Sequence, residues 1–381
     1  MEQFVVSARK YRPIRFVDVV GQEHVTQTLL NALRLGRPAH AYLFCGPRGV
    51  GKTTCARILA KAVNCLNPTA EGEPCNECDS CRQFNEGRSL TIFELDAASN
   101  NSVDDVRQLI EQLRYIPQGG RRSVYIIDEV HMLSTAAFNA FLKTLEEPPA
   151  HALFILATTE KHKIPATILS RCQKFDFRRI PPEPITAHLA DIARQENIPY
   201  EEEALFLIAQ KADGGLRDAL SLFDTLVNFG QGRLSHEVAL DQLNVLDYDI
   251  YFRLTDLMQT GDHAEALLLL NGVIERGFDG LSFLTGLIEH LRNLLVGRQA
   301  KTFALLEVSQ SVRRRYQEQA KALEPALILH AFHLALETEQ KYRNSRQPRL
   351  LIELLLVKIV HLQAAFELAV ESAALPQKKK S

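Results

Sequence analysis

The 381-residue sequence predicts an α/β domain with a parallel sheet flanked by helices, followed by a region that is almost wholly helical. Up to about residue 180, short β-rich apolar runs alternate with helical patterns, which is typical of βαβ units. Three prolines within 181–184 then break this pattern, because proline cannot continue a helix or a central strand. From residue 185 onward the pattern is that of amphipathic helices.

The buried strands of the first domain are predicted at residues 41–45, 124–127 and 153–157. We place domain boundaries so that residues 1–180 form the α/β domain, 181–243 a small helical domain and 244–370 a second helical domain, with 371–381 as a tail. Segment 350–362 is apolar on nearly every face and is therefore expected to be a helix buried inside a bundle.

Composition excludes several classes of function. Lys and Arg number 44 against 46 Asp and Glu, a formal net charge of -2, so any contact with nucleic acid must use a local patch. The longest apolar stretch, 350–362, is short and contains Glu353 and Lys358, and the N-terminus offers no apolar leader. We therefore expect a soluble, cytoplasmic protein that does not enter a membrane.

The strongest motif is GPRGVGKT at residues 46–53, a full match to the phosphate-binding loop pattern G-x-x-x-x-G-K-[ST]. It follows a predicted strand and precedes a helical pattern, which argues against a glycine-rich turn that binds nothing. Its backbone amides would face the phosphates, Lys52 would reach the β- and γ-phosphates, and the Thr53 hydroxyl would ligate Mg²⁺. The expected nucleotide-binding residues of the loop are Gly46, Pro47, Arg48, Gly49, Val50, Gly51, Lys52, Thr53 and Thr54.

A second apolar strand ends in Asp128 and Glu129. Asp128 is expected to hold Mg²⁺, and Glu129, one residue beyond the strand, to orient and activate the attacking water. Two solvated acids at a strand end are the alternative. The run Asp128-Glu129-Val130-His131 also resembles one helicase superfamily, but that class needs a second α/β motor domain, which the helical remainder does not supply.

The next strand ends in two hydroxyls, Thr158 and Thr159. In an open parallel sheet this edge faces the ligand crevice, so one of them is expected to sense the γ-phosphate or the water. Capping or ordinary packing explains them equally well, and the pattern does not choose between the two threonines.

Cys65, Cys75, Cys78 and Cys81 follow the spacing C-x9-C-x2-C-x2-C in a turn-rich stretch. Four thiolates at short spacing without an export signal favour a closed, structural Zn²⁺ site in a module at 65–81. An iron-sulfur cluster and four unligated thiols are the alternatives. Cys45 and Cys55 flank the phosphate loop and are expected to be small core residues.

Several further motifs, taken together with the phosphate loop and the cysteines, indicate one known family. These motifs are ARKYRP at 8–13, FVDVVGQE at 16–23, DEVHML at 128–133, KTLEEPP at 143–149, LSRC at 169–172 and GLRDAL at 215–220. The chain resembles, over essentially its whole length, the AAA+ ATPase subunits of bacterial DNA polymerase III clamp loaders, of the gamma/tau type.

The resemblance implies an AAA+ domain, a helical lid and a helical collar through which subunits form a pentameric ring. The region around Arg12, Val19 and Val20 would line the adenine pocket. Thr159 would be sensor 1, with Thr158 as the adjacent alternative. Arg217 would be sensor 2, and Arg171 would act on ATP held by the neighbouring subunit.

The resemblance further implies a motor subunit that uses ATP to open a ring-shaped sliding clamp and to grip primer-template DNA. The longer product in this family continues well past the collar, so a chain that stops at Ser381 is expected to be a truncated chain or the short product. A branch-migration motor is a second hypothesis, but that class lacks the four cysteines and ends in a winged helix. A zinc-bearing scaffold without ATPase activity is a third, and the intact Lys52, Thr53, Asp128 and Glu129 argue against it.

Overall fold

The computed structural model describes residues 6–113, 122–299 and 301–366, which form two compact units divided between residues 234 and 235. The expected tail at 371–381 lies outside the described residues. Within the described ranges, no helix is both long enough and apolar enough to cross a membrane.

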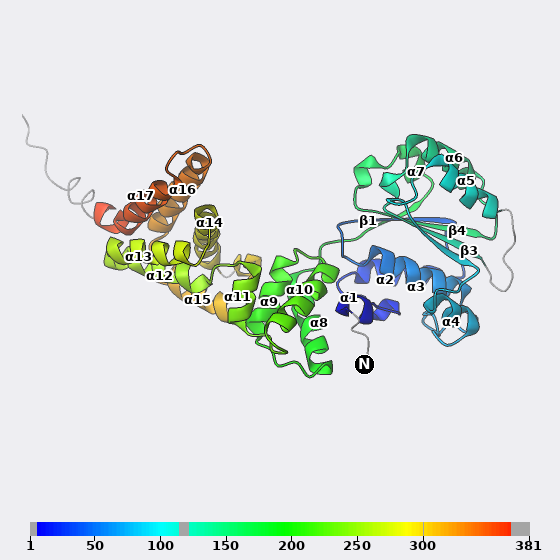
Figure 1. The fold of residues 1–381 in the computed structure, drawn as a ribbon, viewed down its shortest axis with the longest axis horizontal. Helices are drawn as coiled ribbons and strands as arrows, with labels where there is room; N and C mark the ends of the chain where they lie inside the picture. The colour runs from blue at the N-terminus through cyan, green and yellow to red at the C-terminus, as the bar shows by residue number, and fades with distance from the viewer. Residues whose placement is uncertain (1–5, 114–121, 300, 367–381) are drawn as a thin grey trace, which may run out of the picture. The chain divides into compact units, whose positions relative to one another are not determined.

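A five-stranded sheet forms the centre of the first unit (Figure 1). Its strands are β1 (Ala41–Cys45), β2 (Ile92–Asp96), β3 (Ser123–Asp128), β4 (Ala152–Thr158) and β5 (Gln173–Asp176). All neighbours pair in parallel, in the order β2-β3-β4-β1-β5. The three strands predicted from apolar runs are confirmed, and the two that the sequence did not indicate are the edge strands.

Helices surround this sheet and continue beyond it. In the first unit they are α1 (Ser7–Lys10), α2 (Glu23–Arg34), α3 (Lys52–Asn64), α4 (Asp79–Asn85), α5 (Val103–Gln112), α6 (Thr135–Glu146), α7 (Ala166–Leu169), α8 (Pro182–Gln195), α9 (Glu202–Lys211) and α10 (Leu216–Phe229). Short 3-10 turns are η1 (Phe16–Asp18), η2 (Val130–Met132) and η3 (Lys161–Lys163).

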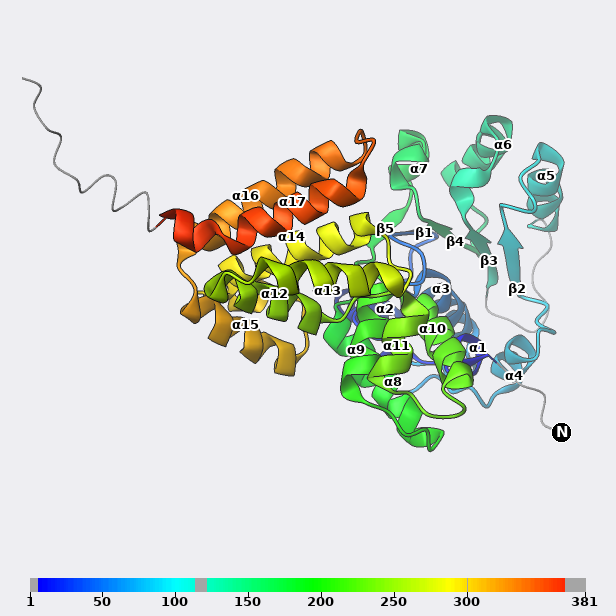
Figure 2. The ribbon, with the colours of Figure 1, turned by 60° about the vertical axis from the view of Figure 1, so that its left-hand side comes forward.

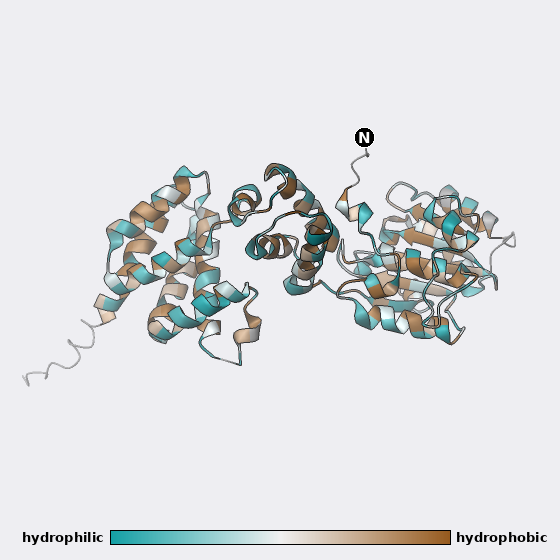
Figure 3. Ribbon diagram, turned by 90° about the horizontal axis from the view of Figure 1, so that it is seen from below, coloured by the Kyte–Doolittle hydropathy of each residue, from teal (hydrophilic) through white to brown (hydrophobic). Residues whose placement is uncertain are grey.

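The sheet is buried on both faces, because successive strand side chains point to opposite sides. On β1, Tyr42 and Phe44 join the core beneath α2 and α3, whereas Leu43 joins the core beneath α5, α6 and α7. Figure 3 shows the strands as the most consistently apolar elements, while the helices mix polar and apolar residues. This is the predicted α/β layer architecture.

The proline cluster at 181–184 marks the start of α8, which begins at Pro182. Proline is tolerated in the first helical turn because the amide hydrogens there have no partner within the helix. Helices α8, α9 and α10 pack together, and α1 packs against α10. The amide of Ser7 donates to Asp224 Oδ2 at 2.7 Å, which ties the N-terminal helix to α10.

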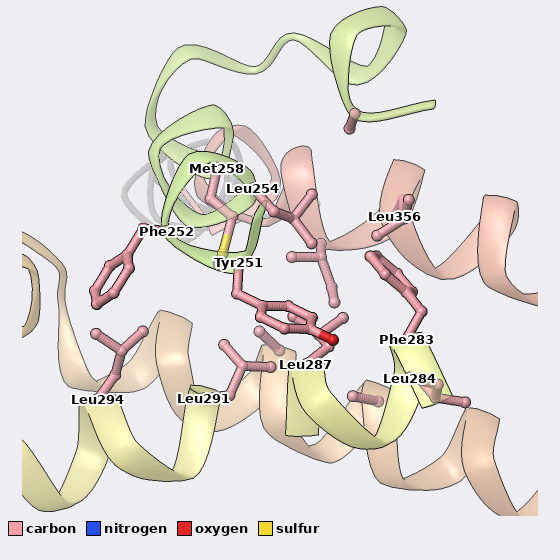
Figure 4. Close-up of a cluster of buried hydrophobic side chains, with 14 of the residues drawn as sticks. Tyr251, Phe252, Leu254, Met258, Phe283, Leu284, Leu287, Leu291, Leu294 and Leu356 are labelled. Carbon is pink, nitrogen blue, oxygen red and sulfur yellow. The ribbon is translucent and has the colours of Figure 1, made fainter. Parts of the chain in front are cut away.

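The second unit is helical throughout its described residues. Its helices are α11 (His236–Leu243), α12 (Tyr248–Thr260), α13 (His263–Glu275), α14 (Gly280–Gly297), α15 (Gln310–Ala322), α16 (Pro325–Tyr342) and α17 (Pro348–Val360), with the 3-10 turn η4 (Phe303–Leu305). Figure 4 shows its core, in which Tyr251, Phe252, Leu254 and Met258 of α12 meet Phe283, Leu287, Leu291 and Leu294 of α14.

Helix α17 lies beside α16 in both Figure 1 and Figure 2 and packs against α13. The expectation that segment 350–362 is buried on nearly every face is wrong in one respect. Leu350 and Leu354 are 54% and 48% exposed, because residues four apart lie on the same side of a helix and this side faces away from the bundle. Ile352, Leu355 and Leu356 are buried as expected.

Candidate functional site

The phosphate loop lies at the carboxyl edge of the sheet, between β1 and α3. Gly49 and Gly51 have φ values of 76° and 103°, in the left-handed region that favours glycine. Because parallel strands end at a common edge, the ends of β3 and β4 bring Asp128 and Thr158 to the same side of the sheet. The sequence motifs that are far apart in the chain therefore meet there.

Lys52 is the first residue of α3 and is only 5% exposed. Its Nζ donates to the carbonyl oxygens of Gly46 at 2.8 Å and Pro47 at 2.6 Å. Burial lowers the pKa of Lys52, and the nearby Glu129 and Asp128 carboxylates oppose this shift. The cation is thus held inside the curl of the loop, where a phosphate group could replace the two carbonyls.

Thr53 and Asp128 are in direct contact, with the Thr53 hydroxyl donating to Asp128 Oδ2 at 2.7 Å. Asp96, which ends the neighbouring strand β2, pairs in register with Asp128. Hydroxyl and carboxylate oxygens are the ligands that Mg²⁺ prefers, so this donor set fits the ion. Asp96 was missed by the sequence analysis because strand β2 was not predicted.

Glu129 adopts a left-handed backbone conformation with φ 46°, which costs a non-glycine residue about 1–3 kcal/mol. Its Oε2 accepts hydrogen bonds from the Thr159 hydroxyl at 3.0 Å and from the Thr159 amide at 3.2 Å. The carboxylate beyond β3 is therefore tethered to the end of β4.

The two threonines that the sequence could not separate have different neighbours. The fully buried Thr158 has its Oγ1 3.1 Å from His131 Nδ1 and accepts the Glu160 amide at 3.0 Å. Thr159 instead contacts Glu129. Of the two, Thr159 is the one whose hydroxyl touches the acid expected to activate water.

A cavity of about 350 Å³ opens beside the phosphate loop. The predicted residues that line it are Arg12, Val19, Val20, Arg48, Gly49, Val50, Gly51, Lys52, Thr53, Thr54, Asp128, Glu129 and Arg217. Lining residues that were not singled out are Ala8, Tyr11, Pro13, Asp96, Ile180, Leu216 and Leu220. Ala8, Tyr11 and Pro13 stood in the ARKYRP motif and Leu216 and Leu220 in the GLRDAL motif, whereas Ile180 looks like an ordinary apolar residue.

Four predicted nucleotide-site residues are not among the lining residues: Gly46, Pro47, Thr159, which contacts Glu129, and Arg171. Gly46 packs so tightly on the Phe177 carbonyl that a Cβ would lie 2.5 Å from it. Arg171 is also outside the cavity: its guanidinium donates to Glu146 Oε1 and to the Thr167 carbonyl, both at 2.7 Å.

Among the described residues, the cavity is lined by four cations, Arg12, Arg48, Lys52 and Arg217, and by three acids, Asp96, Asp128 and Glu129. Burial and the nearby guanidinium groups of Arg57 and Arg217 lower the pKa of Arg12. Arg57 also forms an ion pair with Glu94. Several cations around one cavity favour a polyanionic ligand such as a polyphosphate.

Helix α10 meets the phosphate loop at a contact between two glycines. The Arg217 amide lies 3.4 Å from the Gly49 carbonyl oxygen, and a Cβ on Gly49 would lie 3.2 Å from Gly215 Cα. Only a residue without a side chain allows this approach at Gly49.

The four cysteines of the 65–81 module converge, with all four Sγ atoms within 4.8 Å of one another. The Sγ atom of Cys65 lies 3.4 Å from that of Cys75 and 4.0 Å from that of Cys78. A tetrahedral zinc ion with Zn–S bonds of about 2.3 Å separates its sulfur ligands by about 3.8 Å. The cluster therefore fits Zn²⁺.

The remaining cysteines are buried and separate from this cluster. Burial raises the pKa of Cys45 to about 11 and those of Cys55 and Cys172 to about 12. Such thiols stay protonated at neutral pH and behave as small apolar side chains, as predicted for Cys45 and Cys55.

The fold and the cavity together define a P-loop nucleotide-binding protein of the AAA+ class. Three family models match consecutive parts of the chain: DNA polymerase III delta subunit at 21–181, DNA polymerase III clamp loader subunit ATPase lid domain at 184–232, and DNA polymerase III subunits gamma and tau domain III at 234–374.

Curated relatives agree with these models. The chain is 42% identical over 351 residues to DNA polymerase III subunit tau of Bacillus subtilis, covering 92% of this chain and 62% of that protein. It is 36% identical over 360 residues to DNA polymerase III subunit gamma of Buchnera aphidicola subsp. Acyrthosiphon pisum, covering 94% and 99%. The chain belongs to the gamma/tau family of DNA polymerase III clamp loader subunits.

The chain spans 62% of the length of the Bacillus subtilis tau subunit and 55% of that of Escherichia coli. Among solved structures, a RuvB variant of Thermotoga maritima matches with a TM-score of 0.47 and 20% identity, covering 82% of this chain and 91% of that one.

Proposed function

We propose that this chain binds and hydrolyses MgATP as a motor subunit of the bacterial clamp loader, which loads a sliding clamp onto primed DNA. One observation carries the proposal. Thr53, Asp128, Glu129 and Thr159 form a continuous set of contacts beside a phosphate loop whose lysine is already buried in position.

At the phosphate end of the cavity, Lys52 and the loop amides would bind the β- and γ-phosphates. Thr53 and Asp128 would hold Mg²⁺, which neutralises phosphate charge when it is bound. Glu129 would orient and deprotonate the attacking water, and Thr159 would hold Glu129 and sense the γ-phosphate. The hydrogen bonds from Thr159 to Glu129 support this assignment of sensor 1 over Thr158.

At the base end of the cavity, Arg12, Val19 and Val20 would contact the adenine. Arg217, from the first turn of α10, would reach the phosphates as sensor 2. Arg171 would stabilise the transition state in a neighbouring subunit, which is consistent with its place outside this cavity. The four cysteines would hold a structural Zn²⁺, because four thiolates leave no open position for catalysis.

We further propose that residues 1–180 act as the nucleotide-binding domain, 181–243 as the lid and 244–370 as the collar. The partners would be other clamp loader subunits in a pentameric ring, the sliding clamp and primer-template DNA, all in the cytoplasm. Phosphate contacts from helix N-termini and scattered basic residues would explain DNA binding by a chain with a net charge of -2.

The test is the ATPase rate of the assembled ring with sliding clamp and primed DNA, each alone and together. We expect hydrolysis that rises when both are present. ATP binding without hydrolysis under every condition would support the scaffold hypothesis instead. Stimulation by a four-way DNA junction and not by primed DNA would favour the branch-migration hypothesis.

A further inference from the structure

An acidic residue of the cysteine module, Glu73, is buried against the N-terminal segment. Glu73 is only 6% exposed, and its carboxylate points at the backbone of η1. Oε2 accepts the Phe16 amide at 2.9 Å and Oε1 accepts the Val17 amide at 3.0 Å. A buried carboxylate must be matched by donors, and two backbone amides meet that need here.

These two hydrogen bonds supply partners for the backbone amides of η1 that have none within the turn. The Asp18 and Val19 amides donate within the turn, to the carbonyls of Arg15 and Phe16. The first two amides of a helical turn have no partner inside it, and Arg15, which precedes η1, supplies no side-chain cap. Glu73, 57 residues further along the chain, therefore does what an N-cap residue does for most helices.

Glu73 is itself held in place by its own loop. The Thr69 amide donates to the Glu73 carbonyl at 3.0 Å, and the Glu73 amide donates to the Thr69 hydroxyl at 3.2 Å. The loop is attached to α2 by Arg34, whose Nε donates to the Glu71 carbonyl at 2.8 Å. The carboxylate thus projects from a closed turn within the cysteine module.

The segment that Glu73 caps leads directly into the cavity. Phe16 is 1% exposed and Val19 is 8% exposed in the core beneath the sheet, and Val19 and Val20 line the cavity. Val17 is 71% exposed, so its side chain does little to fix the turn. The position of the base end therefore depends both on the buried Phe16 and Val19 side chains and on backbone hydrogen bonds to the module.

We propose that Glu73 is a positioning residue that couples the cysteine module to the base end of the nucleotide cavity. This inference rests on the proposed function, because it assumes that the cavity binds ATP. The module is then more than a separate structural insertion: through one carboxylate it fixes the turn that presents Val19 and Val20 to the ligand. Glu73 forms its hydrogen bonds with η1 and with its own loop and not with the phosphate loop. We therefore expect it to affect recognition of the base and ribose and not of the phosphates.

The test compares the dissociation constants of MgATP and of magnesium tripolyphosphate, which lacks base and ribose, by calorimetry. Glu73→Ala should weaken MgATP binding about tenfold, because two charge-assisted hydrogen bonds are lost. Tripolyphosphate binding should stay unchanged. Glu73→Gln keeps one acceptor oxygen and should weaken ATP binding by only about threefold, again without a change in tripolyphosphate binding.

Glu77→Ala is the matched control, since it removes an exposed acid from the same module. Equal weakening of ATP and tripolyphosphate would show a general loss of structure and overturn the proposal, as would unchanged ATP affinity in Glu73→Ala. If Glu73→Ala does not fold, Glu73→Gln decides: selective weakening of ATP supports the coupling, and no change refutes it. A wild-type chain that binds no ATP would instead refute the proposed function.

Discussion

The phosphate end and the base end of the cavity are built in different ways. The phosphate end uses consecutive residues of one loop and the ends of two central strands, so its side chains are placed by the sheet itself. The base end uses Arg12, Val19 and Val20, which come from an N-terminal segment and from the residues after the 3-10 turn η1, and Arg217 joins the cavity from α10. Local sequence determines the first region, whereas long-range contacts determine the second.

This difference predicts that substitutions at the phosphate end change hydrolysis or phosphate binding, while substitutions that loosen the supports of the base end change recognition of the nucleoside and leave turnover intact. Arg171 belongs to neither end and gives the largest expected effect. In an assembled ring, Arg171→Ala should lower hydrolysis about 10³-fold or more, the range known for arginine fingers. The isolated subunit should bind ATP normally, because Arg171 does not line its cavity.

The stability of Arg171→Ala should change by only about 0–1 kcal/mol, since its ion pair with Glu146 is partly exposed. Mixing Arg171→Ala subunits with Lys52→Ala subunits should restore some activity where intact halves meet. Arg107→Ala, an exposed arginine paired with Asp104, serves as control. Rings that assemble but regain no activity at any mixing ratio would place Arg171 in cis or in a structural role.

Glu129→Gln tests the chemistry of the phosphate end. Turnover should fall about 10²- to 10⁴-fold, because a general base is lost, while ATP stays bound. Single-turnover hydrolysis and nucleotide retention on a filter measure the two quantities. Glu111→Gln, an exposed acid on α5, is the control. Unchanged turnover in Glu129→Gln would mean that the base lies elsewhere.

Lys52→Ala tests binding at the same end and should weaken ATP affinity about 10- to 100-fold. The free energy of unfolding should be unchanged or higher at pH 7, because burial lowers the pKa of Lys52 and so disfavours its charged form in the folded state. Wild-type stability should rise relative to the variant as pH approaches 10.5, the ordinary value, since the unfolded chain holds this proton more tightly. Urea unfolding at pH 7 and pH 10 checks the sign: a relative fall would contradict it.

Cys78→Ala has the smallest expected effect and tests the remote support of the base end. The module should lose zinc and local stability. ATP affinity should fall about tenfold, because Glu73 would no longer be held against η1. Turnover at saturating ATP should stay near that of the wild type. Metal analysis and ATP titration measure these quantities. Cys172→Ala serves as the control, because it removes a cysteine outside the module and should leave the module's metal bound. Iron in the wild-type protein, or loss of turnover with ATP affinity intact, would refute the assignment.

The sequence predicted the central strands because β1, β3 and β4 are buried on both faces and are therefore continuously apolar. The edge strands could not be predicted in this way. In β2 only the first residue, Ile92, is buried and the others are half-buried or exposed, and three of the four residues of β5 are exposed. Without β2, the alignment of Asp96 with Asp128 could not be inferred either.

The residues of the candidate site also fall into those that a local pattern predicts and those that it does not. The motif predicted Lys52 and Thr53, because a phosphate loop encodes its function in consecutive residues. The role of Ile180 as a cavity residue depends on how the segment before α8 folds back, which no local pattern records. The cap from Glu73 spans 57 residues and joins an acid to backbone amides, a pairing without any side-chain signature.

The contact between Gly49 and Gly215 has a consequence for how this cavity can change. A Cβ on Gly49 would lie 3.2 Å from Gly215 Cα, and a Cβ on Gly215 would lie 3.3 Å from the Arg48 carbonyl oxygen, so a methyl group on either side requires a small shift of loop or helix. Neither residue carries a charge or a side-chain donor. An alanine at Gly215 would bring its Cβ to 3.0 Å from Asp218 Oδ2 and 3.3 Å from the Arg48 carbonyl oxygen, so the tolerance of this position to substitution measures how closely helix and loop must approach.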